Sequence, residues 1–436
     1  MKRLGFSVAL ILLCCGFALG QGQFKVLYTF GGVDGAGPSS LATDNSGNLY
    51  GTTTYGGEGC APYGCGIAFE LSPNNDGGWT QTILYNFCQD EACADGMYPT
   101  GFAVFDSAGN LYGTTGSGGS FDGGVIFELS PSGPPWTETT LYDFCQELDN
   151  CPGGDVPSGS VAFDAKGNLY GTTRYGGSPC TSQGSAGCGT VYQLMPPSAQ
   201  GGARTERAIY SFCTHGSGQY SCPDGTFPVG GVTVDKSGNV YGTTVYGGHN
   251  PKNCEFRGCG TVFKLTPTSG SWTYSQLYAP STSAVGESPM AAPTVVSESV
   301  YGSFAEGARN DAGAVFGLLP KGGLEEFSLP GGQDGSPRAA SIVEDNELYG
   351  SSYGATNSSD AGVVFQVTSA GQETVLHSFC SEANCADGIG PLGMVRDKSG
   401  NLYGVTYWGG DASCPFSTNG CGVVFEITNP EASSKR

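Results

Sequence analysis

Residues 47–53 of this chain read Gly-Asn-Leu-Tyr-Gly-Thr-Thr, and residues 66–71 read Gly-Ile-Ala-Phe-Glu-Leu. Versions of these two segments recur in the same order seven times. The Tyr-Gly step of the first segment falls at Tyr50, Tyr112, Tyr170, Tyr241, Tyr301, Tyr349 and Tyr403. The aromatic residue of the second segment falls at Phe69, Phe127, Tyr192, Phe263, Phe316, Phe365 and Phe425. Such self-similarity indicates repeated units that share one continuous core.

The fourth unit shows what one repeat predicts. Residues 230–235 are rich in β-branched side chains and predict a strand, residues 236–239 a tight turn, and residues 240–244 a second strand. A long loop leads to a third strand at 260–265, and a fourth follows at 272–278. Four short antiparallel strands in each of seven units predict an all-β, seven-bladed β-propeller. We expect the glycine after each repeated tyrosine to let neighbouring blades approach closely.

The two ends of the repeat predict how the ring closes. The last unit stops after a third strand at residues 423–427. Residues 24–30 carry a spare strand whose Leu-Tyr-x-Phe pattern matches the fourth strands at Leu84–Phe87 and Leu141–Phe144. We therefore predict that residues 24–30 complete the last blade, which leaves no open sheet edge.

The first 20 residues have the pattern of a secretory signal peptide. Lys2 and Arg3 precede an apolar run at residues 4–17, and Ala18 and Gly20 are small residues before a cleavage point. The run is shorter than the roughly 18 residues of a membrane span. We expect residues 1–20 to be removed, residues 21–430 to form the propeller and residues 431–436 to be a tail, in a secreted or periplasmic protein.

A lipid anchor at Cys14 or Cys15 is the alternative to free secretion. The residues before these cysteines, Ile11 to Leu13, are bulky where a lipid-attachment box has small ones, so plain export is favoured.

The charge excludes one class of function. The formal net charge is −21, and the 18 Lys and Arg residues are scattered. Nucleic-acid binding requires clustered basic residues that neutralise phosphates, and we therefore expect none. An acidic surface favours cations, neutral sugars or basic partners. We expect a monomer without a membrane span.

The cysteines outside the leader form eight close pairs. Four pairs lie between the second and third strands: Cys60/Cys65, Cys180/Cys188, Cys254/Cys259 and Cys414/Cys421. Four follow the fourth strand: Cys88/Cys93, Cys145/Cys151, Cys213/Cys222 and Cys380/Cys385. Units that lack one member lack the other, which predicts disulfides in an exported protein. Zinc sites are the alternative, but the spacings vary. In a propeller both loops emerge on one face, so all eight disulfides should lie there.

Aspartates recur where one unit leads to the next. An Asp-Gly step occurs there at Asp34, Asp95, Asp224, Asp334 and Asp387, with Asp155 as a looser match. These carboxylates are candidate ligands for a divalent cation at the channel mouth, and Ca²⁺ suits hard oxygen ligands. The alternative, which we favour, is that each Asp-Gly shapes a turn.

Four aromatic residues precede Gly-Gly after the second strand: Tyr55, Tyr175, Tyr246 and Trp408. Aromatic faces at loop bases suit stacking on sugar rings, and packing between blades is the equally weighted alternative.

Signals for catalysis are weak, and we assign no catalytic residue. The histidines, His215, His249 and His377, belong to different units. The Gly-x-Ser-x-Gly match at residues 350–354 lies at a strand end without the following helix that a nucleophile elbow needs. The aspartate before each repeated Gly-Asn (Asp44, Asp106, Asp164, Asp235 and Asp397) is expected to cap its turn.

The segments Asp44–Thr53, Asp106–Thr115, Asp164–Thr173 and Gly260–Phe263 resemble the GloVer tandem repeat of exported bacterial proteins, a choice-of-anchor group. The resemblance implies export and a propeller-like repeat, and it supplies no catalytic residues. The function expected from the sequence is binding of carbohydrate or a protein partner through the disulfide-braced loops. The alternatives are a lyase or hydrolase that uses channel-mouth carboxylates, and a structural envelope or adhesion protein.

Overall fold

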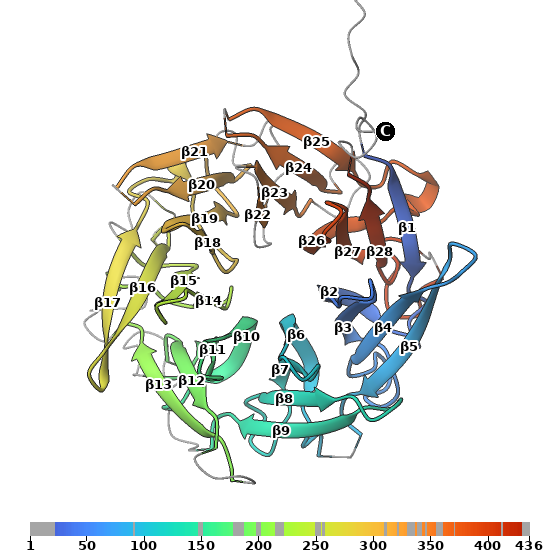
Figure 1. Cartoon of the computed structure of the whole chain (residues 1–436), viewed down its shortest axis with the longest axis horizontal. Helices are drawn as coiled ribbons and strands as arrows, with labels where there is room; N and C mark the ends of the chain where they lie inside the picture. Colours follow the sequence, from blue (N-terminus) through green and yellow to red (C-terminus); the bar gives the residue numbers. More distant parts are fainter. Residues whose placement is uncertain are drawn as a thin grey trace, which may run out of the picture.

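The seven repeats form seven four-stranded antiparallel sheets in a ring (Figure 1). The computed structural model describes residues 22–89, 92–146, 151–177, 187–197, 202–213, 222–248, 254, 258–308, 312–320, 322–328, 336–337, 342–344, 347–354, 361–369, 371–410 and 413–429, without the side chains of Phe102 and Ala103. The predicted seven-bladed β-propeller is therefore confirmed. The proposed leader and tail lie outside the described residues.

Each blade runs from an innermost to an outermost strand. Blade 1 contains β2 (Ala36–Thr43), β3 (Leu49–Tyr55), β4 (Ile67–Pro73) and β5 (Trp79–Asn86). Blade 2 contains β6 (Met97–Phe105), β7 (Leu111–Ser117), β8 (Val125–Ser130) and β9 (Thr137–Asp143), and blade 3 contains β10 (Asp155–Phe163), β11 (Leu169–Tyr175), β12 (Thr190–Met195) and β13 (Thr205–Ser211). Blade 4 contains β14 (Val232–Val234), β15 (Val240–Thr244), β16 (Thr261–Thr268) and β17 (Ser271–Tyr278), and blade 5 contains β18 (Thr294–Val296), β19 (Ser299–Phe304), β20 (Ala314–Leu318) and β21 (Leu324–Ser328). Blade 6 contains β22 (Ile342–Glu344), β23 (Glu347–Ser352), β24 (Val363–Val367) and β25 (Glu373–Ser378).

Blade 7 joins the two ends of the chain. It contains β26 (Ile389–Arg396), β27 (Leu402–Trp408) and β28 (Val423–Ile427), and its outermost strand is β1 (Phe24–Thr29). Strand β1 pairs antiparallel with β28, from Phe24 opposite Ile427 to Thr29 opposite Val423. The predicted closure is confirmed, and Figure 1 shows β1 lying beside β28.

Helices are nearly absent from the part of the chain that the structure describes. Two single 3-10 turns, η3 (Ser283–Val285) and η5 (Ala383–Cys385), occur there. No helix in these described ranges has the length and apolar content needed to cross a membrane.

The glycine after each repeated tyrosine has a different role from the one expected. Gly51 lies opposite Phe69 in the register of β3 and β4, and a Cβ on Gly51 would lie 2.6 Å from the Phe69 ring. The same overlap recurs in all seven blades, as at Gly242 with Phe263. The glycine therefore makes room for the aromatic ring of the next strand in its own blade, and the expectation of close approach between blades is wrong for this position.

Neighbouring blades approach each other closely at other glycines, on the innermost strands. A Cβ on Gly101 would overlap the carbonyl group of Gly159, and a Cβ on Gly159 would overlap the backbone of Gly230. Gly101 and Gly159 have positive φ angles of 74°. The backbones of blades 2, 3 and 4 thus come into direct contact near the channel, where a side chain has no space.

The repeated aspartate of each first turn holds that turn closed. Asp44 Oδ1 accepts hydrogen bonds from the backbone N–H groups of Ser46 (2.8 Å) and Asn48 (2.9 Å). Asp44 Oδ2 accepts from the Asn48 amide (3.0 Å) and the Tyr50 hydroxyl (3.4 Å). The same four bonds occur at Asp106, Asp164, Asp235 and Asp397. The predicted capping role is confirmed.

The antiparallel order gives the ring two different faces. The Asp-capped turns lie on one face, which we call the turn face. The loops between second and third strands and the crossovers between blades lie on the other, which we call the disulfide face.

Seven of the predicted cysteine pairs form disulfides on the disulfide face: Cys60–Cys65, Cys88–Cys93, Cys145–Cys151, Cys213–Cys222, Cys254–Cys259, Cys380–Cys385 and Cys414–Cys421. The eighth pair includes Cys180, which lies outside the described residues.

Candidate functional site

Two of the four aromatic residues that were predicted to bind a ligand line the same pocket on the disulfide face. Tyr55 at the end of β3 and Trp408 at the end of β27 occupy equivalent positions in blades 1 and 7. They line a cavity of about 190 Å³ together with Tyr63 and Phe416. We call this cavity the aromatic pocket. It lies where the first and last blades of the chain meet.

Both walls of the aromatic pocket are braced by disulfides. Tyr63 lies in the loop that the Cys60–Cys65 bond closes, and Phe416 lies in the loop that the Cys414–Cys421 bond closes. The rings of Tyr63 and Phe416 are 6.3 Å apart, and the Tyr63 side chain is 53% exposed. Short disulfide loops restrict the backbone, so the Cα positions from which these two rings project have little freedom.

The described lining of the aromatic pocket is uncharged. The lining residues that the structure describes are aromatic, small or hydroxyl-bearing, and they include no Asp, Glu, Lys or Arg. Tyr63 and Ser417 offer hydroxyl groups, and Trp408 offers an indole N–H. The pocket can therefore hold a flat, partly apolar ring and a small number of hydrogen bonds.

The other two aromatic residues that were predicted to bind a ligand lie outside the aromatic pocket. Tyr175 and Tyr246 both pack on Phe227, with ring centroids 5.5 Å and 6.0 Å away. Phe227 precedes Pro228 and has a positive φ of 56°. Tyr175 and Tyr246 thus contact one ring that the crossover into blade 4 places between them, and they do not line the aromatic pocket.

Four of the crossover aspartates, Asp34, Asp95, Asp224 and Asp387, are described by the structure, and each lies in a separate crossover. Each described one accepts a hydrogen bond from the ring side chain of the preceding outermost strand. The pairs are Tyr28–Asp34 (2.6 Å), Tyr85–Asp95 (2.8 Å), Tyr210–Asp224 (2.9 Å) and His377–Asp387 (3.1 Å). Asp334 lies outside the described residues. A Ca²⁺ ion takes six to eight oxygen ligands, whereas no described crossover supplies more than one of these aspartates, so this arrangement favours the turn-shaping role. Ca²⁺ binding stays a prediction.

Asp155 is not the counterpart of these aspartates in blade 3. Gly154 occupies the place of Gly35, because both have large positive φ angles (116° and 118°) and both face a threonine. The residue at the aspartate position is therefore Gly153. A Cβ there would lie 3.1 Å from Glu206 Oε2 and 3.1 Å from the Tyr142 hydroxyl. Glu206, from β13, places its carboxyl group where the other blades have the aspartate.

Glu206 should make stability depend on pH. Burial raises its pKa to about 7, against an opposing hydrogen bond from Tyr142. The folded chain thus binds this proton more tightly than the unfolded chain does. The contribution of this difference to the free energy of unfolding is therefore fully present below pH 4.5 and is lost as the pH rises through about 7. We expect Glu206→Gln to be more stable relative to the wild type at pH 8 than at pH 5, by about 1 kcal/mol after allowance for solvent screening.

Urea unfolding of both proteins at pH 5 and pH 8 measures this difference. Substitution of the exposed Glu58 by Gln is the matched control and should show no such change. An equal effect of Glu206→Gln at the two pH values would contradict the assignment.

His377, the one histidine among the described residues, pairs with a crossover aspartate in the same way as the tyrosines of other blades. His377 Nε2 lies 3.1 Å from Asp387 Oδ2, and its ring stacks on Phe24 of β1 at 3.6 Å. Burial would raise the pKa of Asp387, but hydrogen bonds from His377 and Ser381 outweigh it and lower the pKa. His377 therefore takes the place that Tyr28, Tyr85 and Tyr210 hold in other blades. His215 and His249 lie outside the described residues.

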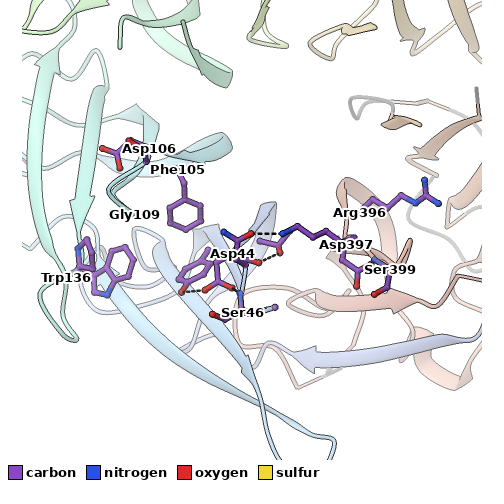
Figure 2. A pocket seen from close by; sticks show the side chains of 16 residues that line it. Asp44, Ser46, Phe105, Asp106, Gly109, Trp136, Arg396, Asp397 and Ser399 are labelled. Atoms are coloured by element: carbon purple, nitrogen blue, oxygen red, sulfur yellow. Dashed lines mark hydrogen bonds between the residues drawn. The ribbon is translucent and has the colours of Figure 1, made fainter. Parts of the chain in front are cut away.

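A larger cavity of about 880 Å³ lies on the turn face among blades 7, 1 and 2 (Figure 2). Figure 2 shows Phe105 and Trp136 on the side of blade 2, Asp44 and Ser46 in the middle, and Arg396 on the side of blade 7. This cavity was not predicted, because the long cysteine-containing loops indicated a binding site on the disulfide face alone.

The residues missed in the two cavities carry different signals in the sequence. Tyr63 and Phe416 are aromatic residues in the cysteine-closed loops between the repeated segments. Trp136 instead recurs, because Trp79 and Trp272 hold the equivalent position at the start of the fourth strand in their units.

Comparison with known proteins places the chain in a family. The family described as the Gloeobacter/Verrucomicrobia repeat matches residues 16–256 and 252–435. No curated protein matches the sequence. Among solved structures, a streptogramin B lyase is similar, with a TM-score of 0.54 and 13% identity over 93% of this chain and 98% of that one. A catalytically inactive virginiamycin B lyase from Staphylococcus aureus with quinupristin has a TM-score of 0.53 and 14% identity over 93% and 100% of the two chains. At this identity the likeness shows the propeller fold alone.

Proposed function

The chain belongs to the Gloeobacter/Verrucomicrobia repeat family, and we propose that it is an exported propeller that binds carbohydrate through the aromatic pocket. The observation that carries this proposal is the convergence of four aromatic side chains from two blades: Tyr55, Tyr63, Trp408 and Phe416. Aromatic faces suit the apolar faces of sugar rings, and the hydroxyl and indole groups suit sugar hydroxyls.

The size and charge of the pocket favour sugar over a protein surface. Its volume of about 190 Å³ equals about six water molecules, which suits a single sugar ring. A pocket whose described lining residues are uncharged is suited to a neutral ligand, and the chain's net charge of −21 repels anions at longer range. A protein partner would instead require a broad interface of about 800 Å² on each side.

Export is supported by two features. The disulfides persist in oxidising compartments, and Lys2 and Arg3 precede an apolar run in a signal-like leader. Secretion and periplasmic residence are both consistent with these features.

A glycan array tests the proposal. We expect the wild type to bind at least one neutral glycan and Trp408→Ala to bind it about fivefold to a hundredfold more weakly, taking for a sugar ring the roughly 1–3 kcal/mol that stacking of a base on an aromatic ring contributes. Tyr175→Ala is the matched control, since Tyr175 has an equivalent sequence position but packs on Phe227 outside the aromatic pocket. Wild-type protein that binds no glycan, or equal losses in the two variants, would overturn the proposal.

The lyase or hydrolase alternative receives no specific support from the site. The described crossover carboxylates and His377 are engaged in hydrogen bonds within their own crossovers. Similarity to the lyases supplies a fold, and a fold hosts many functions.

A further inference from the structure

The turn face carries two cavities of the same construction. The first, of about 880 Å³, lies among blades 7, 1 and 2, and the second, of about 200 Å³, lies between blades 3 and 4. Each is lined by Asp-capped turns of neighbouring blades, a repeated tyrosine, a proline and a tryptophan. The tryptophan is Trp136 in the first cavity and Trp272 in the second.

The two tryptophans are fixed in the same way. Trp136 lies beside Tyr50 of the preceding blade, with ring centroids 6.1 Å apart, and Trp272 lies beside Tyr170 at 5.9 Å. The backbone N–H of Trp136 donates to the Leu84 carbonyl group (2.7 Å), which ties blade 2 to blade 1 at this point. Both indoles are half-buried and line their cavities, so each cavity has a rigid aromatic wall.

The polar walls are nearly neutral in charge and rich in donors. The turn aspartates are saturated by their own turns, as the four hydrogen bonds to Asp44 show. Lys398 donates one hydrogen bond to Asn45 Oδ1 (3.0 Å), while an ammonium group carries three donors. Lys166 and Lys236 line the second cavity and are exposed. These are groups that can donate to the hydroxyl oxygens of a ligand.

We propose that the turn face is a second binding surface, and that it takes a neutral polysaccharide with sugar rings against Trp136 and Trp272. The tryptophan rings can stack on sugar rings, and the lysine ammonium groups can donate hydrogen bonds to sugar hydroxyls. The turn aspartates already accept hydrogen bonds within their own turns, so the surface suits an uncharged, hydroxyl-rich polymer. The net charge of −21 disfavours a polyanion. Because both cavities belong to one ring and one face, a long chain that contacts both gains avidity. This surface is separate from the aromatic pocket, which lies on the opposite face.

Affinity electrophoresis separates the two surfaces when Trp408→Ala is used as the background, because this variant lacks one of the four aromatic rings that line the aromatic pocket. The probes are gels that contain a neutral β-glucan, a neutral galactomannan or polygalacturonate. We expect the Trp408→Ala protein to be retarded by at least one neutral polysaccharide. Adding Trp136→Ala or Trp272→Ala should weaken this retardation about fivefold or more, and adding both should abolish most of it.

Trp79 provides the matched control. Its ring lies 6.4 Å from that of Tyr403, the same type of contact between blades, but Trp79 lines neither cavity. Trp79→Ala should leave retardation unchanged. Trp136→Phe keeps a ring beside Tyr50, and it should keep the wild-type melting temperature and lose part of the affinity. No retardation of Trp408→Ala by either neutral polysaccharide, stronger retardation by polygalacturonate, or an equal loss in Trp79→Ala would overturn the proposal.

Discussion

A chain that lacks residues 21–30 should lose most of the stability of the whole ring. This segment contains β1, the outermost strand of blade 7, and its removal would expose the β28 edge and the core around Phe30 and Leu27. Phe30 is fully buried and Leu27 is 9% exposed, and each contributes about 1.5–3 kcal/mol by burial. With the lost strand pairing, we expect a cost of about 5 kcal/mol or more, which approaches the total stability of many domains.

Thermal unfolding followed by circular dichroism measures this loss. Lys25→Ala is the matched control, because Lys25 is exposed on the same strand and donates only to the Gly77 carbonyl group among the described contacts. A synthetic peptide of residues 21–31, added to the truncated chain, should restore part of the melting temperature. An unchanged melting temperature after the deletion would show that β1 does not close the ring.

Gly159→Ala should destabilise the ring by about 3 kcal/mol or more. Gly159 lies in the bulge of β10 between Ser158 and Ala162, and its φ is +74°. A Cβ at this position would overlap backbone atoms of Gly230 and Gly231 in the next blade. Backbone cannot move aside as a flexible side chain can, so the inner strands of blades 3 and 4 would have to separate.

Gly167→Ala separates this steric cost from the cost of a positive φ. Gly167 lies in an Asp-capped turn with φ of +79°, and a Cβ there has no atom within 4 Å. We expect about 1 kcal/mol of destabilisation from the left-handed backbone alone. Urea unfolding of both variants gives the comparison. Equal losses would show that the blades do not touch at Gly159.

Much of the fold follows from local pattern. The count of blades, the four strands in each and the closing strand at residues 24–29 were predictable, because every unit repeats the same alternation of strand and turn residues. The disulfide pairs were predictable because both cysteines of a pair lie within one short loop. The turn role of Asp44 was predictable because its partners lie within six residues.

Contacts between strands and blades were harder to predict. The role of Gly51 was misassigned because its neighbour Phe69 lies 18 positions away and becomes adjacent through the register of β3 and β4. The replacement of the crossover aspartate by Glu206 beside Gly153 was likewise not predictable, since the two residues are far apart in the sequence and become neighbours only when β13 folds against the crossover.

The repeated segments alone are enough to specify a ring of blades with disulfides on one face, because short-range pairing and turn chemistry act within each unit. The position of a pocket depends on which unequal loops become neighbours when the ring closes. Tyr55 and Trp408 are separated by most of the chain, and they share one cavity because β1 joins blade 7 and brings that blade against blade 1. The burial and the cavity at this joint arise from the closed ring, in which residues distant in sequence exclude water together.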